Sequence, residues 1–163
     1  MKMELIQPFI NAADAVLAQT LQAPTTIGEV SMEEEAYRRK GIAAMVRVAG
    51  DIEGRVIFDL EPGTAKGVTS KLTGDADTAE EMMPEAICEL ANQVIGNAVT
   101  VLNDQGFHFK VMPPEIHTAE RGEQSSEDTE AMVMSFETVT GTVFMNIAMR
   151  YNRRRKGEGV AAD

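Results

Sequence analysis

Hydrophobic positions divide the chain into segments with the period of a helix and segments with the period of a strand. From Glu4 to Gln22 apolar residues recur three or four positions apart, which predicts a first helix from about Pro8 to Gln22 because a proline is tolerated in a first turn. The longest periodic segment predicts a second helix of roughly seven turns from Thr78 to Asp104. A short helix is expected from Thr64 to Leu72, closed by a glycine.

Strand-like runs, rich in β-branched and aromatic residues, occupy much of the rest of the chain. They cover Thr25–Met32, Ile42–Val48, Val56–Leu60, Phe107–Thr118, Val133–Val139 and Thr142–Tyr151. The second and third runs are predicted to form one hairpin, and the last two runs a second one. Pro113 and Pro114 interrupt the fourth run, which favours an edge position or a bulge. The charged block 33–40 is interpreted as a solvated hairpin connection, and 119–130 as a mobile loop.

A faint internal repeat organises these elements. The segment Gly54–Leu60 compares position by position with Gly141–Ile147, and each is the last strand of a helix–strand–strand–strand unit. We therefore predict an α/β fold of the α+β type with a pseudo-two-fold repeat. Two long helices and a short one would pack on a six-stranded, mainly antiparallel sheet.

Composition narrows the classes of function. The 163 residues include 44% hydrophobic residues, enough for a core, and the formal net charge of −11 argues against nucleic acid as the main partner. A single cysteine excludes an internal disulfide. With no signal pattern and no membrane-spanning run, we expect a soluble cytoplasmic domain over residues 1–152 and a basic, disordered tail over 153–163.

The long helix carries the candidate chemistry. Its predicted core face comprises Met83, Ile87, Leu90, Val94, Ala98 and Val101. The opposite face presents Glu85, Glu89, Asn92, Gly96 and Asn103 in a narrow stripe without any cation. This stripe is either the solvated side of an amphipathic helix or a docking surface on which Glu89 and Asn92, three residues apart, act together.

The residue types of the stripe favour a site that acts by positioning the reacting groups. Neither Glu89 nor Asn92 is a good nucleophile, but a carboxamide donates and accepts hydrogen bonds and can therefore orient a water molecule. Phosphoryl transfer depends mainly on alignment and charge stabilisation, so it suits such a site.

The segment Glu85-Ala-Ile-Cys-Glu89-Leu-Ala-Asn92, followed at a distance by Pro114, resembles the signature of the CheX/CheC/FliY phosphatases. That signature is an acid or serine, three residues, a glutamate, two residues, an asparagine and a distant proline. The continuation Gly96-Asn97 and the segment Val56–Pro62 are also similar to CheX, and the resemblance spans Met1–Tyr151. Glu85 departs from the family, which more often has serine or aspartate there.

The resemblance implies a specific activity. Members of this family dephosphorylate the phospho-aspartate of the chemotaxis response regulator CheY. By similarity, Asn92 would position the attacking water, Glu89 would pair with the invariant lysine of the receiver, and Glu85, Gly96 and Pro114 would contact the partner. The chain would need no cofactor of its own, because the receiver supplies the Mg²⁺. The resemblance also implies a homodimer joined through strands.

The first helix can be aligned on the long one so that Asn11 matches Asn92. Pro8 then falls at the position of Glu89, which indicates one active site rather than two. A non-catalytic adaptor of the same fold, related to the switch protein FliM, is the alternative function.

Three further residues have simpler interpretations. Cys88 is typical of a small buried apolar residue. His108 and His117 lack a third ligand, which disfavours a metal site.

Overall fold

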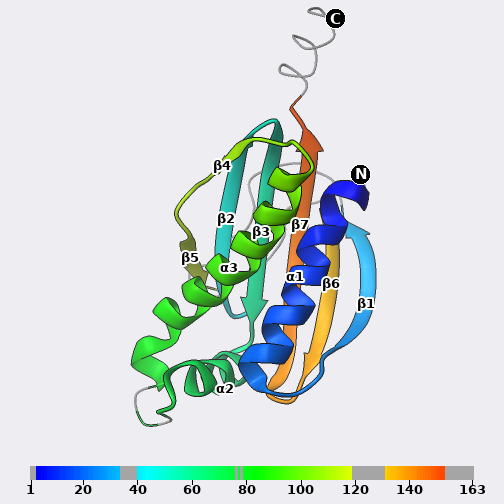
Figure 1. Ribbon diagram of the computed structural model, residues 1–163. Helices are drawn as coiled ribbons and strands as arrows, with labels where there is room; N and C mark the ends of the chain where they lie inside the picture. The colour runs from blue at the N-terminus through cyan, green and yellow to red at the C-terminus, as the bar shows by residue number, and fades with distance from the viewer. Residues whose placement is uncertain (1–2, 34–39, 76, 78, 119–130, 153–163) are drawn as a thin grey trace, which may run out of the picture.

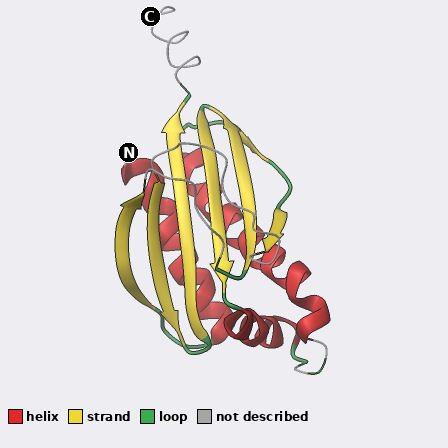
Figure 2. Cartoon of the chain, turned by 180° about the vertical axis from the view of Figure 1, so that it is seen from behind, coloured by secondary structure: helices red, strands yellow, loops and turns green. Residues whose placement is uncertain are grey.

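Three helices pack on one face of an open sheet, as Figure 1 shows, and Figure 2 shows the sheet from its other face. The computed structural model describes residues 3–33, 40–75, 77, 79–118 and 131–152. The helices are α1 (Met3–Leu21), α2 (Pro62–Thr73) and α3 (Ala79–Asp104). The strands are β1 (Thr26–Glu33), β2 (Ile42–Gly50), β3 (Ile52–Leu60), β4 (Phe109–Val111), β5 (Glu115–Thr118), β6 (Ala131–Thr138) and β7 (Gly141–Tyr151). No described helix is long and apolar enough to cross a membrane.

The sheet has the order β1-β6-β7-β3-β2-β4, with β5 also paired to β2, and all its pairs are antiparallel. The order has a two-fold symmetry: replacing each strand by its equivalent in the other helix–strand–strand–strand unit gives the same order, read from the opposite edge. The central register has the same symmetry, because Val56 pairs with Ile147 and Leu60 with Val143, which are equivalent pairs under the predicted repeat. The pseudo-two-fold α+β fold is confirmed, as are both predicted hairpins.

The predicted strand Phe107–Thr118 is two short strands, so the sheet has seven strands rather than six. The break contains Pro113 and Pro114, which have no N–H to donate to a ladder. Both short strands pair with β2 at one edge of the sheet, as the prolines indicated.

The prediction that the charged block 33–40 connects a hairpin is wrong. Strand β1 pairs with β6, whereas β2 lies between β3 and the short strands β4 and β5. A charge block identifies a solvated connection but carries no information about which strands pair. Residues 34–39 themselves lie outside the described part of the chain, as do the predicted loop 119–130 and the predicted tail 153–163.

Helix α1 begins at Met3, five residues before its predicted start, and contains Pro8 in its interior. The additional turn buries Leu5 and Ile6 completely. Fully burying two such side chains contributes about 3–6 kcal/mol, which is comparable to or larger than the cost of about 3 kcal/mol for an internal proline. The gain from burial therefore offsets the cost of Pro8, the residue from which the start of the helix was predicted.

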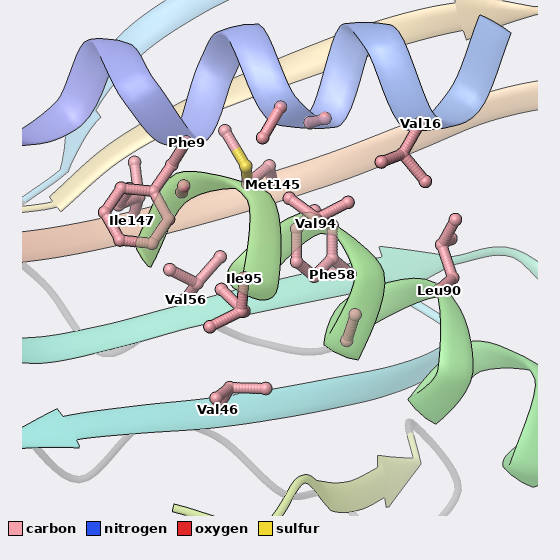
Figure 3. Packing of buried hydrophobic residues seen from close by; sticks show 14 of the residues in the cluster. Phe9, Val16, Val46, Val56, Phe58, Leu90, Val94, Ile95, Met145 and Ile147 are labelled. Atoms are coloured by element: carbon pink, nitrogen blue, oxygen red, sulfur yellow. The ribbon is translucent and has the colours of Figure 1, made fainter. Parts of the chain in front are cut away.

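The core lies between the sheet and the helices α1 and α3 (Figure 3). Phe9 and Val16 of α1 and Leu90, Val94 and Ile95 of α3 meet the strand residues Val46, Val56, Phe58, Met145 and Ile147 there. This packing fixes the rotation of α3 about its axis and so determines which of its residues face solvent.

Two members of the predicted core face of α3 are not fully buried. Met83 is half-buried and Val101 remains 44% exposed, whereas Ile95 and Leu102 are buried. The helical period alone locates the buried face of α3 to within a fraction of a turn, and the contact with α1 determines which residues at the edges of that face are buried.

Candidate functional site

The outer side of α3 carries the predicted stripe. Glu85, Glu89, Asn92 and Gly96 are all exposed and lie on one side of the helix, while Ile87, Leu90 and Val94 on the other side are buried. The long helix contains no Lys or Arg. An accessible carboxylate and an accessible carboxamide therefore stand side by side on an anionic surface that faces away from the sheet.

The Glu89 carboxylate is oriented by a hydrogen bond from a residue of the same helix. Gln93 Nε2 donates a hydrogen bond of 3.1 Å to Glu89 Oε1 from one turn further along. Because this donor is a neutral amide and not a cation, the carboxylate remains available to pair with a cation from a partner. The sequence prediction did not include Gln93, although its spacing of four residues from Glu89 is a signal that could have found it.

The carboxamide of Asn92 forms no side-chain hydrogen bond with the described residues. Both its donor and its acceptor are therefore available to water or to a partner. An amide in this state can orient a water molecule without first losing a bond inside the protein.

Gly96 has no structural role that the fold explains. A Cβ built on it meets nothing within 4 Å, and its φ is not in the left-handed region. A glycine inside a helix costs about 1 kcal/mol of stability relative to alanine, so glycine is an unfavourable residue at this position. A bare backbone patch next to Asn92 is what close approach by another molecule requires.

Pro114 lies apart from the helix stripe. It is half-buried and directly precedes β5, which pairs with β2 and packs against α3. The structure therefore places Pro114 at the sheet edge on the α3 side of the molecule, where it borders the helix layer without belonging to the stripe.

Helix α1 repeats much of the burial pattern of α3. When Asn11 is placed on Asn92, seven buried positions coincide in the two helices: Leu5, Ile6, Phe9, Ile10, Ala13, Leu17 and Leu21 match Ala86, Ile87, Leu90, Ala91, Val94, Ala98 and Leu102. Asn11 is exposed like Asn92, but Pro8 occupies the position of Glu89. The burial pattern supports the alignment on which the single-site prediction depends.

The other candidate residues do not form a second site. Cys88 is half-buried, and burial raises the pKa of its thiol, which makes it a poor nucleophile. His117 Nε2 lies 3.8 Å from Glu115 Oε1, and the described residues contain no group of three side chains suited to a metal ion.

Comparison with known proteins finds one matching family and several relatives. Residues 42–137 match the profile of the family described as "Chemotaxis phosphatase CheX". A curated relative, the CheY-P phosphatase CheX of Thermotoga maritima, is 23% identical over 118 residues, which are 71% of this chain and 76% of the relative. The matched range contains all of α3 and Pro114.

Solved structures share the whole fold. A CheC-like superfamily protein from Shewanella sp. PV-4 has a TM-score of 0.78 at 20% identity and covers 92% of this chain and 99% of its own. A chain from the CheX-CheY-BeF3-Mg²⁺ complex of Borrelia burgdorferi has a TM-score of 0.75 at 30% identity and covers 91% of this chain and 99% of its own.

Proposed function

This chain belongs to the CheX family of chemotaxis phosphatases, and on that basis we propose that it hydrolyses the aspartyl phosphate of a CheY-type response regulator. The observation that carries the proposal is the exposed pair Glu89 and Asn92 on a helix without cations. Receivers of this type act in the cytoplasm, so the proposal places the chain there.

The reaction that the pair supports is a direct attack by water. Asn92 enters the receiver's active site, and its carboxamide holds a water molecule in line with the phosphorus. As the bond from the water oxygen to phosphorus forms, the bond from phosphorus to the aspartate oxygen breaks. The products are inorganic phosphate, which takes up a proton of the water, and the free aspartate carboxylate. Alignment of this kind supplies several kcal/mol without a covalent intermediate on this chain.

Glu89 pairs with a lysine of the receiver and thereby fixes the position of Asn92. The hydrogen bond from Gln93 sets the direction of the carboxylate before the partner arrives. Gly96 lets the receiver's backbone approach, and Glu85 and Pro114 border the contact. The Mg²⁺ that assists the reaction belongs to the receiver, as the composition of the Borrelia burgdorferi complex supports. Each chain has one such site, because α1 has Pro8 where the acid is needed.

We also propose that the chain forms a homodimer through β1. This strand of eight residues forms one edge of the sheet, with a register irregularity between Ile27 and Val30 in its pairing with β6, and an open edge is a template for pairing. It exposes three large apolar side chains, Ile27, Val30 and Met32. At the other edge the ladder is divided between the short strands β4 and β5.

A phosphate-release assay tests the proposed function. Receivers from the same genome are phosphorylated with a small-molecule donor in Mg²⁺, and the lifetime of the phosphoryl group is measured with and without the protein. We expect the protein to shorten the lifetime for at least one receiver. Glu89→Ala should lower kcat/KM at least about thirtyfold, because the receiver's lysine would then be buried without its partner.

Glu81→Ala is the matched control, since Glu81 is an exposed glutamate on the same helix, two turns before Glu89. Its activity should stay close to that of the wild type. Unchanged lifetimes with every receiver would refute the phosphatase function. Receiver binding with an unchanged lifetime would instead establish the alternative, a non-catalytic adaptor of the same fold.

A further inference from the structure

The apolar side chain of Val99 borders the polar stripe of α3. It is half-buried, so one part of it packs against the core and the rest faces solvent. Val99 follows Asn92 by seven residues, which places it about 20° from Asn92 around the helix axis. Val101 lies about 180° from Asn92 by the same count, on the side of α3 that meets α1. Val99 therefore belongs to the face of the proposed site, whereas Val101 does not.

Gly96 and Val99 are neighbours on the surface of this face. Residues three positions apart in a helix have Cβ positions about 5–6 Å apart. Side chains lean toward the N-terminus of their helix, so Val99 projects toward the turn that contains Gly96. A segment of a partner that lies against the bare backbone of Gly96 therefore reaches Val99 with the side chains it carries there.

The polar backbone groups of Gly96 are already paired. Inside α3 its N–H and its carbonyl take part in the hydrogen bonds of the helix. The carbonyl accepts a second hydrogen bond, of 3.0 Å, from the hydroxyl of Thr100. Because a carbonyl oxygen has two lone pairs, Gly96 offers a partner no free acceptor. The surface made by Gly96 and Val99, the Gly96–Val99 patch, therefore complements an apolar group rather than a polar one.

The size of a protein interface includes this patch in the contact. A specific interface covers about 800 Å² on each partner, which corresponds to a radius of roughly 16 Å. Val99 lies about 10 Å from Asn92 along the helix axis and on the same side of the helix. A receiver docked on Glu89 and Asn92 therefore covers the patch as well.

On the basis of the proposed function, we propose that the Gly96–Val99 patch receives an apolar side chain from the receiver segment that passes over Gly96, and that this contact strengthens receiver binding. Glu89 and Asn92 act at the phosphorylation site, whereas the patch lies beyond it along α3. The patch therefore contributes to affinity rather than to the chemical step. A receiver with a charged side chain at this point would be bound more weakly, because that charge would lose water without gaining a partner.

The test makes one substitution at two valines on different sides of α3. Val99→Thr places a hydroxyl in the patch with little change in shape, and Val101→Thr makes the same change at a position that is 44% exposed outside the proposed contact. Phosphate release is measured at several concentrations of the phosphorylated receiver. We expect Val99→Thr to raise KM about fivefold or more at unchanged kcat, and Val101→Thr to leave both unchanged.

A second variant covers the case in which Val99→Thr does not fold. Val99→Ala brings no polar atom against the core and removes two methyl groups from the patch, so it should raise KM about threefold, with Val101→Ala as its control. Affinity is also measured without catalysis, by titration with a receiver that carries BeF3 and Mg²⁺, the groups present in the Borrelia burgdorferi complex. The Kd of each Val99 variant should rise by the same factor as its KM.

The outcomes separate the two proposals. If the wild type shortens the phosphoryl lifetime but the Val99 variants have the KM and Kd of the Val101 variants, the patch proposal is overturned and the phosphatase function stands. A fall in kcat at unchanged KM would also overturn it, because the patch would then act on the chemical step. If the wild type binds a receiver without shortening its phosphoryl lifetime, the phosphatase function fails and the Kd values alone decide on the patch. A wild type that binds no receiver would overturn both proposals.

Discussion

Gly96 offers a prediction in which stability and activity should change in opposite directions. A methyl group added at this position meets nothing within 4 Å, so Gly96→Ala introduces no clash inside the protein. Alanine is favoured over glycine in a helix interior by about 0.8–1 kcal/mol. For a domain of this size, that gain corresponds to a rise in Tm of roughly 2–4 °C, measurable by thermal denaturation.

The same methyl group should reduce phosphatase activity. If the receiver's backbone packs against Gly96, the added carbon overpacks the interface at a cost of about 1–3 kcal/mol. This cost corresponds to a loss of roughly 5- to 150-fold in kcat/KM for phosphate release.

Gly63→Ala is the control, because Gly63 of α2 likewise has nothing within 4 Å of an added Cβ and lies outside the proposed contact. It should be no less stable than the wild type and fully active. A Gly96→Ala variant with raised Tm and unchanged activity would refute the role of Gly96 in close approach. A lowered Tm would refute the packing on which the prediction is based.

Three further predictions concern other parts of the molecule. The hydrogen bond from the Tyr151 hydroxyl to Glu4 raises the pKa of Tyr151 from 10.0 to about 12. The contribution of this hydrogen bond to stability is therefore complete below pH 10.0 and is lost as the pH rises toward 12. The fall in Tm across this range should be smaller in Tyr151→Phe than in the wild type, and an equal fall would contradict the role of this hydrogen bond. Burial raises the pKa of Cys88, so a thiol reagent at pH 8 should modify it more slowly in the folded protein than in the unfolded chain, and equal rates would contradict its burial. Light scattering should find a dimer that Val30→Lys converts to a monomer, whereas a monomeric wild type would rule out the proposed assembly through β1.

Local patterns were sufficient to predict most elements of the fold. The period of α3, the turn residues of the two hairpins and the αL glycine at Gly74 are short-range signals, and the structure has these elements close to their predicted bounds. The repeat between Gly54–Leu60 and Gly141–Ile147 also predicted the symmetry of the central strand pair.

The features that were not predicted depend on contacts between distant parts of the chain. The start of α1 follows from the burial of Leu5 and Ile6 against the sheet. The position of β1 next to β6 joins residues about a hundred positions apart in the sequence, for which a charge block between β1 and β2 is no guide. The exposure of Val101 depends on how α1 packs against α3, so it could not be predicted from either helix alone.

The pair Glu89 and Asn92 could be predicted from the sequence because both residues lie on one helix. The spacing of Glu89 and Asn92 determines that both share a face, and the apolar residues of the same helix determine that this face is the outer one. Their roles in catalysis remain a prediction.

The phosphatase rate of Asn92→Ala tests the central claim most directly. Asn92 is exposed, so the variant should keep its stability within about 0.5 kcal/mol. If its carboxamide orients the water, the variant should lose about 10²–10³-fold in kcat, equivalent to roughly 3–4 kcal/mol, while its affinity for the receiver changes little.

Asn103→Ala is the matched control, since Asn103 is an exposed asparagine on the same face of the same helix, but about 16 Å along the axis from Asn92 and so too far away to hold the same water. It should release phosphate at the rate of the wild type. A folded Asn92→Ala variant with the kcat of Asn103→Ala would contradict the account, because the attacking water would then be held by another group.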